Sequence, residues 1–265
     1  MFNFNNLTPT VRALLFANIA CYLAQISLLP LITKIGSLYP IGSPNFFPWQ
    51  FLTYMFLHGG FFHILFNMFA LISFGPLLEQ QWGAQRFLVF WLICGMGAGV
   101  LYEGVKYVEI NKLVASQQEF RAAPSGATFA EFYRNNLPGD ETYEPLAEAM
   151  TRNPTNAEYV ASATATVDAI VSESRSGVGM LGASGAVFGV LFAFAYLFPN
   201  SKMMIFPIPI PIAAKYFVFG YAAFELYKGI HPSPGDNVAH FAHLGGLLVG
   251  FILVKVWERG RERFY

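Results

Sequence analysis

The sequence predicts an all-α, polytopic membrane protein: a bundle of six transmembrane helices with a large extracytoplasmic insert between the third and fourth spans. Of the 265 residues, 55% are hydrophobic and only 12% are charged, whereas soluble domains carry about 25% charged residues. Apolar segments recur six times, each close to the roughly 20 residues with which a helix crosses a bilayer. One long polar stretch interrupts them. The formal net charge of zero argues against a nucleic-acid partner.

The six expected spans take up most of the chain on either side of the insert. Their approximate limits are 11–31, 58–78, 87–107, 181–198, 212–228 and 238–257. The fourth and fifth are short, and the fifth departs most from a transmembrane pattern because it contains Glu225. Residues 1–107 thus hold three spans, residues 181–265 hold three more with a tail, and together they form one domain.

Basic residues in the short loops set the expected orientation. The C-terminal tail carries Arg259, Arg261 and Arg263, so it should face the cytoplasm, and six spans put the N-terminus on the same side. No basic residue precedes the first apolar stretch, and Arg12 lies within it. We therefore expect the first span to be kept in the mature protein and not removed as a signal peptide. We expect a multi-pass protein of the bacterial cytoplasmic membrane, with the lipid bilayer itself as a partner.

The insert, residues 108–180, differs in composition from the rest of the chain. Between residues 103 and 182 there are six basic and eleven acidic residues, and the orientation above places this stretch outside the cytoplasm. Some of its apolar residues recur at near-helical spacing, among them Phe129 and Phe132. We expect short surface helices that cap the bundle. Their role stays open between a bare connection and a surface that binds substrates or partners.

A serine stands among small residues where the fourth span begins, in Gly182-Ala183-Ser184-Gly185. Polar side chains are expensive inside hydrocarbon and usually serve a function there. Gly185 and Gly189 lie four residues apart, which lets another helix approach closely. The backbone N–H of Ser184 falls in the first helical turn, where such groups lack intrahelical partners. The alternative is a serine that contributes only to helix packing.

The sixth span carries a matching pattern, a histidine among small residues, in Ala242-His243-Leu244-Gly245-Gly246. Ala242, Gly246 and Gly250 form a second small stripe. His243 lies beside this stripe, so its imidazole could reach a serine on the facing helix. A nucleophile beside a base is the minimum for covalent hydrolysis. His240, three residues earlier, is a competing base.

A third member of a catalytic triad is not evident from the sequence. Asp236 precedes His243 by seven residues, about 10 Å along a helix at 1.5 Å per residue, which is too far to orient the ring. His240 and His243 have a spacing that zinc ligands use, but no HExxH motif is present. We therefore expect no metal and no cofactor.

The second span carries His63 and Asn67. Four residues apart, they share one face of a helix, and that face should point into the protein. A neutral imidazole and an amide are suitable donors to a developing oxyanion. Hydrogen bonding between helices that only stabilises packing is the alternative.

These motifs, in this order and one to a span, resemble the rhomboid family of intramembrane serine proteases. The matching pieces are residues 63–67, 182–185 and 242–246. The resemblance covers the chain apart from the insert, and it implies a rhomboid-like bundle of six helices.

The resemblance also implies a role for each motif. Ser184 would be the nucleophile and His243 its general base, because the family's base stands directly before the Leu-Gly-Gly string; this selects His243 over His240. His63, Asn67 and the N–H of Ser184 would bind the oxyanion. The residues implied to pack near the site are Gly182, Gly185, Phe188, Gly246 and Gly250.

Two more positions match the family. Phe188, one turn after the serine, corresponds to an aromatic residue that packs against the histidine, and Glu79 corresponds to a structural glutamate. The implied activity is hydrolysis of peptide bonds in transmembrane segments of other proteins, near the extracytoplasmic face. A catalytically silent relative that binds such segments remains an alternative. So does a small-molecule transporter, although the sequence shows no internal repeat of the kind many transporters have.

Overall fold

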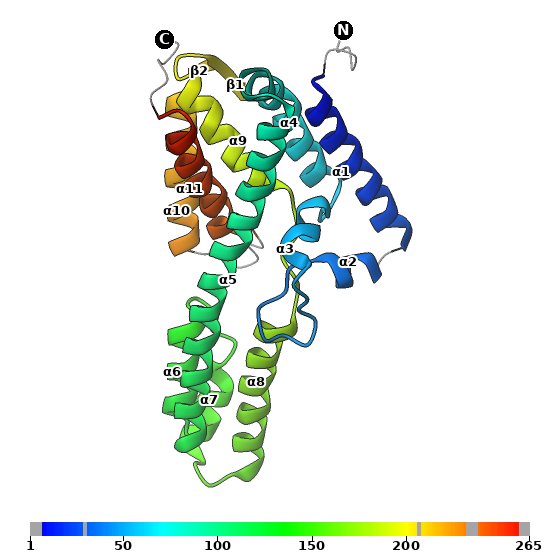
Figure 1. The fold of residues 1–265 in the computed structure, drawn as a ribbon. Coiled ribbons are helices and arrows are strands. Elements are labelled where there is room, and N and C mark those ends of the chain that lie inside the picture. The colour runs from blue at the N-terminus through cyan, green and yellow to red at the C-terminus, as the bar shows by residue number, and fades with distance from the viewer. Residues whose placement is uncertain (1–6, 29–30, 206–207, 232–237, 260–265) are drawn as a thin grey trace.

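The computed structural model describes residues 7–28, 31–205, 208–231 and 238–259, and it is mostly helical (Figure 1). Six helices coincide with the six predicted spans: α1 (Pro9–Leu28), α4 (Phe61–Trp82), α5 (Ala84–Ala122), α9 (Ser184–Leu197), α10 (Ala214–Ile230) and α11 (His240–Trp257). Shorter pieces link α1 to α4, namely α2 (Leu31–Gly36), α3 (Gln50–Thr53) and a 3-10 turn (Tyr54–Phe56). Between α9 and α10, β1 (Lys202–Ile205) and β2 (Ile208–Ala213) pair in an antiparallel sheet.

Among the described residues, four helices are long and apolar enough to cross a membrane: Pro9–Ser27, Phe61–Trp82, Ala84–Ala122 and His240–Trp257. The helices α9 and α10 have 14 and 17 residues. At 1.5 Å per residue, α9 extends about 21 Å, less than the roughly 30 Å hydrocarbon core of a bilayer. The described residues therefore contain four candidate membrane-spanning helices. The six spans predicted from the sequence remain a prediction.

The third predicted span ends later than expected. Hydropathy falls after residue 107, but α5 continues without a break to Ala122 and has 39 residues in all. No glycine or proline stands between Gly104 and Pro124 to end the helix. The insert is consequently carried on a rigid extension of a bundle helix.

The short helices expected in the insert are present as α6 (Gly126–Asn136), α7 (Glu144–Arg152) and α8 (Ala157–Ser176). They pack around the extension of α5 at the end of the bundle away from the start of α1 (Figure 1). Their apolar side chains and those of the α5 extension form a second core, separate from that of the bundle and built on Phe120, Phe129, Phe132 and Met150. The insert thus forms a small helical unit of its own rather than a cover spread over the bundle.

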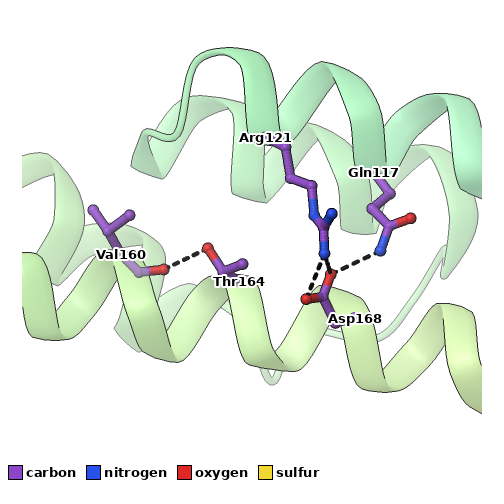
Figure 2. A network of polar contacts seen from close by, with 5 residues as sticks. All are labelled: Gln117, Arg121, Val160, Thr164 and Asp168. Atoms are coloured by element: carbon purple, nitrogen blue, oxygen red, sulfur yellow. Dashed lines mark hydrogen bonds and ion pairs between the residues drawn. The ribbon is translucent and has the colours of Figure 1, made fainter.

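A polar contact fastens α8 to α5 (Figure 2). Nη2 of Arg121 donates to both carboxylate oxygens of Asp168 at 2.7 Å, and Nε2 of Gln117 donates to one of them at 2.7 Å. The guanidinium holds the pKa of Asp168 below its ordinary value.

The start of α1 is held by Glu79, near the end of α4. Its carboxylate accepts the hydroxyl of Thr8 at 2.5 Å and the backbone N–H groups of Thr10 and Val11 at 2.8 and 2.9 Å. First-turn N–H groups have no partner within their own helix, so this carboxylate caps α1. The structural role implied for Glu79 is confirmed.

Candidate active site

Ser184 is the first residue of α9, and the backbone before it is tightly fixed. Gly182 has φ of +135°, a conformation that side chains disfavour, and its N–H donates to the carbonyl of Tyr54 at 2.9 Å. A Cβ at Gly182 would lie 2.7 Å from the His63 ring and 3.5 Å from Oγ of Ser184. Only glycine fits this position, which brings the imidazole of α4 up to the serine of α9.

The structure brings Ser184 and His243 together although 59 residues separate them. Nε2 of His243, on α11, lies 2.8 Å from Oγ of Ser184, within hydrogen-bond distance. The Phe188 ring stacks on the His243 ring with centroids 4.3 Å apart and planes 9° from parallel. This stacking limits rotation of the imidazole and keeps one edge toward the serine.

The two stripes of small residues account for this proximity. A Cβ at Gly246 would overlap the carbonyl oxygen of Gly185, and one at Gly250 would lie 2.9 Å from Cα of Gly189. The backbones of α9 and α11 are therefore in contact, as small residues at four-residue spacing permit. Any larger side chain would push His243 away from Ser184.

His63, on α4, lies beside Gly182, two residues before Ser184, and Asn67 stands one turn further along α4. Nδ1 of His63 accepts the N–H of Gly59 at 3.3 Å, an arrangement in which the ring proton sits on Nε2, the nitrogen nearest Gly182. Asn67 is 6% exposed, and its buried Nδ2 has no hydrogen-bond partner among the described residues. Two donors are thus left for an incoming group.

Glu225, on α10, also reaches the site, a position that was not predicted from the sequence. One carboxylate oxygen, Oε2, lies 2.6 Å from Nδ1 of His240 and 3.0 Å from Nδ1 of His243. The side chain is 2% exposed. An ionisable residue inside an expected span was the available signal, but only the packing of α10 on α11 shows which histidines it meets.

The Rhomboid domain profile matches residues 46–130 and 148–259, which is most of the chain. The chain belongs to the rhomboid family. This match supports the rhomboid-like fold that the three motifs predicted. The four apolar helices indicate an integral membrane protein.

Several curated rhomboid proteins are similar to the chain. An uncharacterized mitochondrial rhomboid protein of Schizosaccharomyces pombe is 28% identical over 220 residues, covering 80% of this chain and 52% of that protein. The mitochondrial Rhomboid protein 1 of Saccharomyces cerevisiae is 28% identical over 212 residues, or 78% of this chain and 42% of that protein. YdcA of Bacillus subtilis, provisionally named a rhomboid protease, is 31% identical over 114 residues, or 39% and 51%. The chain spans about half the length of these relatives.

The prediction of a bacterial cytoplasmic membrane is not supported. Two of these rhomboid relatives, which match about four fifths of the chain, have names that place them in mitochondria. The positive charges of short loops set a side of a membrane and carry no information on which membrane it is.

Around this rhomboid site lie a further histidine, His58, and the residues to be considered as metal ligands. His58, just before α4, is 1% exposed, and its ring contacts that of His63 edge-on at 5.1 Å. Over the described ranges, no group of three or more His, Cys, Asp or Glu is arranged to hold a metal ion. Asp236, discussed above as a distant carboxylate, lies outside the described residues.

Proposed function

We propose that this rhomboid protein is an intramembrane serine endopeptidase that cleaves transmembrane segments of other membrane proteins through a Ser184–His243 dyad. The observation that carries the proposal is the 2.8 Å approach of His243 Nε2 to Ser184 Oγ between two helices in backbone contact. A dyad needs such a hydrogen bond between nucleophile and base.

The proposed reaction follows acyl transfer. Oγ of Ser184 attacks the scissile carbonyl carbon while Nε2 of His243 takes the hydroxyl proton. His243 then gives that proton to the leaving amine, which leaves an acyl-enzyme on Ser184. Water attacks the ester, again with His243 as base, and releases the second product.

The oxyanion of each tetrahedral intermediate needs donors aimed at it before the reaction begins. His63 Nε2, Asn67 Nδ2 and the N–H of Ser184 are proposed for this role. His63 lies against Gly182, Asn67 follows one turn later on α4 with an unpartnered Nδ2 among the described residues, and Ser184 opens α9. In other acyl-transfer enzymes, removal of one such donor lowers kcat by about 10²–10³.

Cleavage is proposed near the membrane face that carries the insert, the extracytoplasmic face in the predicted orientation. The support is that α9 starts, with Ser184, at its end nearer the insert (Figure 1). The substrates would be transmembrane segments entering from the bilayer.

Labelling with a fluorophosphonate serine probe tests the dyad without knowledge of the substrate. We expect the detergent-solubilised wild-type protein to label, and Ser184→Ala and His243→Ala to remain unlabelled. Ser27→Ala is the matched control, since Ser27 is a helix serine whose hydroxyl donates to the carbonyl of Leu23 at 2.8 Å. Folded wild-type protein that neither labels nor cleaves would instead favour a silent rhomboid that binds transmembrane segments.

A further inference from the structure

A carboxylate has no part in a serine–histidine dyad, yet Glu225 places one beside the proposed base. Its Oε2 lies 3.0 Å from Nδ1 of His243, on the opposite side of the ring from the nitrogen that meets Ser184. Burying a carboxylate costs several kcal/mol before any compensation. Glu225 is only 2% exposed, so its burial carries a desolvation free energy that an apolar side chain in the same place would not have.

A glycine on α10 allows a close contact between α10 and α11 near Glu225. A Cβ at Gly229, one turn after Glu225, would lie 3.1 Å from the ring of Phe241 on α11. Glycine at this position lets the two helices approach. His240, one turn before His243, donates its Nδ1–H to the same Oε2 at 2.6 Å. A carboxylate oxygen has lone pairs for two donors, so His240 fixes the oxygen and a second direction remains.

That direction matters for the tautomer of His243. To accept the proton of Ser184 at Nε2, the neutral ring must carry its own proton on Nδ1. Without an acceptor at Nδ1, nothing in the ring itself selects this tautomer over the one that cannot act as a base. The 3.0 Å contact with Oε2 is within ion-pair distance but is not aligned as a hydrogen bond, and catalytic hydrogen bonds are often poorly aligned until substrate binds.

We propose that Glu225 is the positioning residue of a Ser184–His243–Glu225 array, with His240 holding the carboxylate in place. This inference rests on the proposed function. Glu225 accepts the Nδ1–H of His243, which keeps Nε2 free for the serine proton. When His243 becomes imidazolium, the carboxylate stabilises the positive charge and takes no proton itself, as in other serine hydrolases with an acidic third member.

Steady-state cleavage of a tagged single-span substrate in liposomes tests the positioning role, with Glu225→Gln and Glu225→Asp as variants. We expect Glu225→Gln to lower kcat by at least about 10², with KM within about twofold, because an amide can donate to Nδ1 and select the wrong tautomer. Glu225→Asp keeps the charge and should recover part of the lost rate. Glu103→Gln is the matched control: Glu103 is also a buried helix glutamate, 5% exposed, but it accepts the N–H of Ile41.

A carboxylate that only packs α10 against α11 gives a different result. Glu225→Gln would then lower the melting temperature while the folded fraction kept the wild-type kcat, and that outcome overturns the proposal.

Nitrogen-15 NMR of histidine-labelled protein reads the tautomer without turnover, with the His243 signals assigned through His243→Gln. We expect a ring protonated at Nδ1 in wild type, and a shift toward protonation at Nε2 in Glu225→Gln but not in Glu103→Gln. An unchanged tautomer in Glu225→Gln overturns the inference. A tautomer that shifts in a protein with no hydrolase activity upholds the positioning by Glu225 and rejects the proposed function, so the two failures are distinguishable.

Discussion

At the scale of single residues, the site depends on polar groups buried without partners. Within the described part of the chain, Nδ2 of Asn67 is one of them, and a buried donor that makes no hydrogen bond carries a cost of about 1–3 kcal/mol. An oxyanion arriving at the site would relieve that cost only while it exists, which is the property of a group that stabilises a transition state.

The Asn67→Ala variant tests this. We expect kcat to fall by about 10²–10³, with unchanged or slightly raised thermal stability because a buried unpaired donor is removed. Gln50→Ala is the control: Gln50 is fully buried in α3, its Nε2 donates to the carbonyls of Ile35 and Asn45, and its Oε1 accepts the N–H of Tyr39, so this variant should lose stability and keep kcat. Equal rates for wild type and Asn67→Ala would remove Asn67 from the oxyanion site.

Sequence reasoning finds the residues of this site unevenly, for a physical reason. Ser184 and His243 stand in apolar runs beside stripes of glycine. A polar residue, its apolar surroundings and the four-residue spacing of small residues can all be seen in a short stretch of sequence. Glu225 also has a local signal, its charge within an expected span. Its partners are set by how α10 lies against α11, and a linear pattern does not contain that arrangement.

At the scale of elements, the contact between α9 and α11 sets the distance from nucleophile to base. Gly246→Ala would place a methyl group on the carbonyl oxygen of Gly185. Overpacking of this kind costs about 1–3 kcal/mol, so we expect a lower melting temperature and a large loss of fluorophosphonate labelling. The measurements are thermal unfolding in detergent and labelling rate.

Gly220→Ala on α10 is the matched helix control, because a Cβ there meets no atom within 4 Å. In an open helical position alanine is favoured over glycine by roughly 0.5–1 kcal/mol, so this variant should be as stable as wild type or slightly more stable. If both glycine variants behave alike, the close approach of α9 and α11 does not control the site.

The attachment of α8 to α5 should depend on pH through Asp168. Arg121 lowers the pKa of this carboxyl in the folded state below its ordinary value of 3.8. The ionised group therefore stabilises the folded insert at pH values above about 4, and the stabilisation is lost as pH falls through the lower folded-state pKa. Because the pair is exposed, the effect should be small.

Hydrogen exchange of α8 between pH 7 and pH 3 measures this dependence. We expect constant opening free energy down to about pH 4 and a decline below it, and Asp168→Asn should lack that decline. A wild-type profile identical to that of Asp168→Asn would show that the ion pair adds nothing to docking of α8.

The boundary of α5 also shows what a pattern of hydropathy misses. Polarity rises after residue 107, so a prediction based on apolar length ends the span there. The chain nevertheless continues as helix because no residue before Pro124 interrupts it. Hydropathy identifies the part of a helix that can lie in a membrane, whereas helix breakers identify where the helix ends.

At the scale of the whole molecule, the bundle and the insert have separate cores joined by the length of α5 (Figure 1). The insert returns to the bundle at Met180, which pairs with Leu38 through two backbone hydrogen bonds of 2.8 Å. Nothing in the insert core touches Ser184 or His243 among the described contacts. The two units should therefore lose structure independently.

Phe132→Ala tests this independence. Phe132 is 1% exposed in the insert core, and Phe→Ala in a core costs about 3–5 kcal/mol, so hydrogen exchange should speed up in α6, α7, α8 and the insert end of α5, and not in the bundle helices. The labelling rate of Ser184 should stay within about twofold of wild type. Faster exchange in α9 and α11 as well would show that the insert supports the site.

The central claim is that Ser184 and His243 together hydrolyse peptide bonds within a membrane. Its most direct test is co-reconstitution in liposomes with a panel of tagged single-span proteins, followed by mass spectrometry of the products. We expect wild type to give new N-termini inside a transmembrane segment, toward the face that carries the insert, and Ser184→Ala and His243→Ala to give none. Equal cleavage by wild type and Ser184→Ala, or products cut only outside the span, would contradict it.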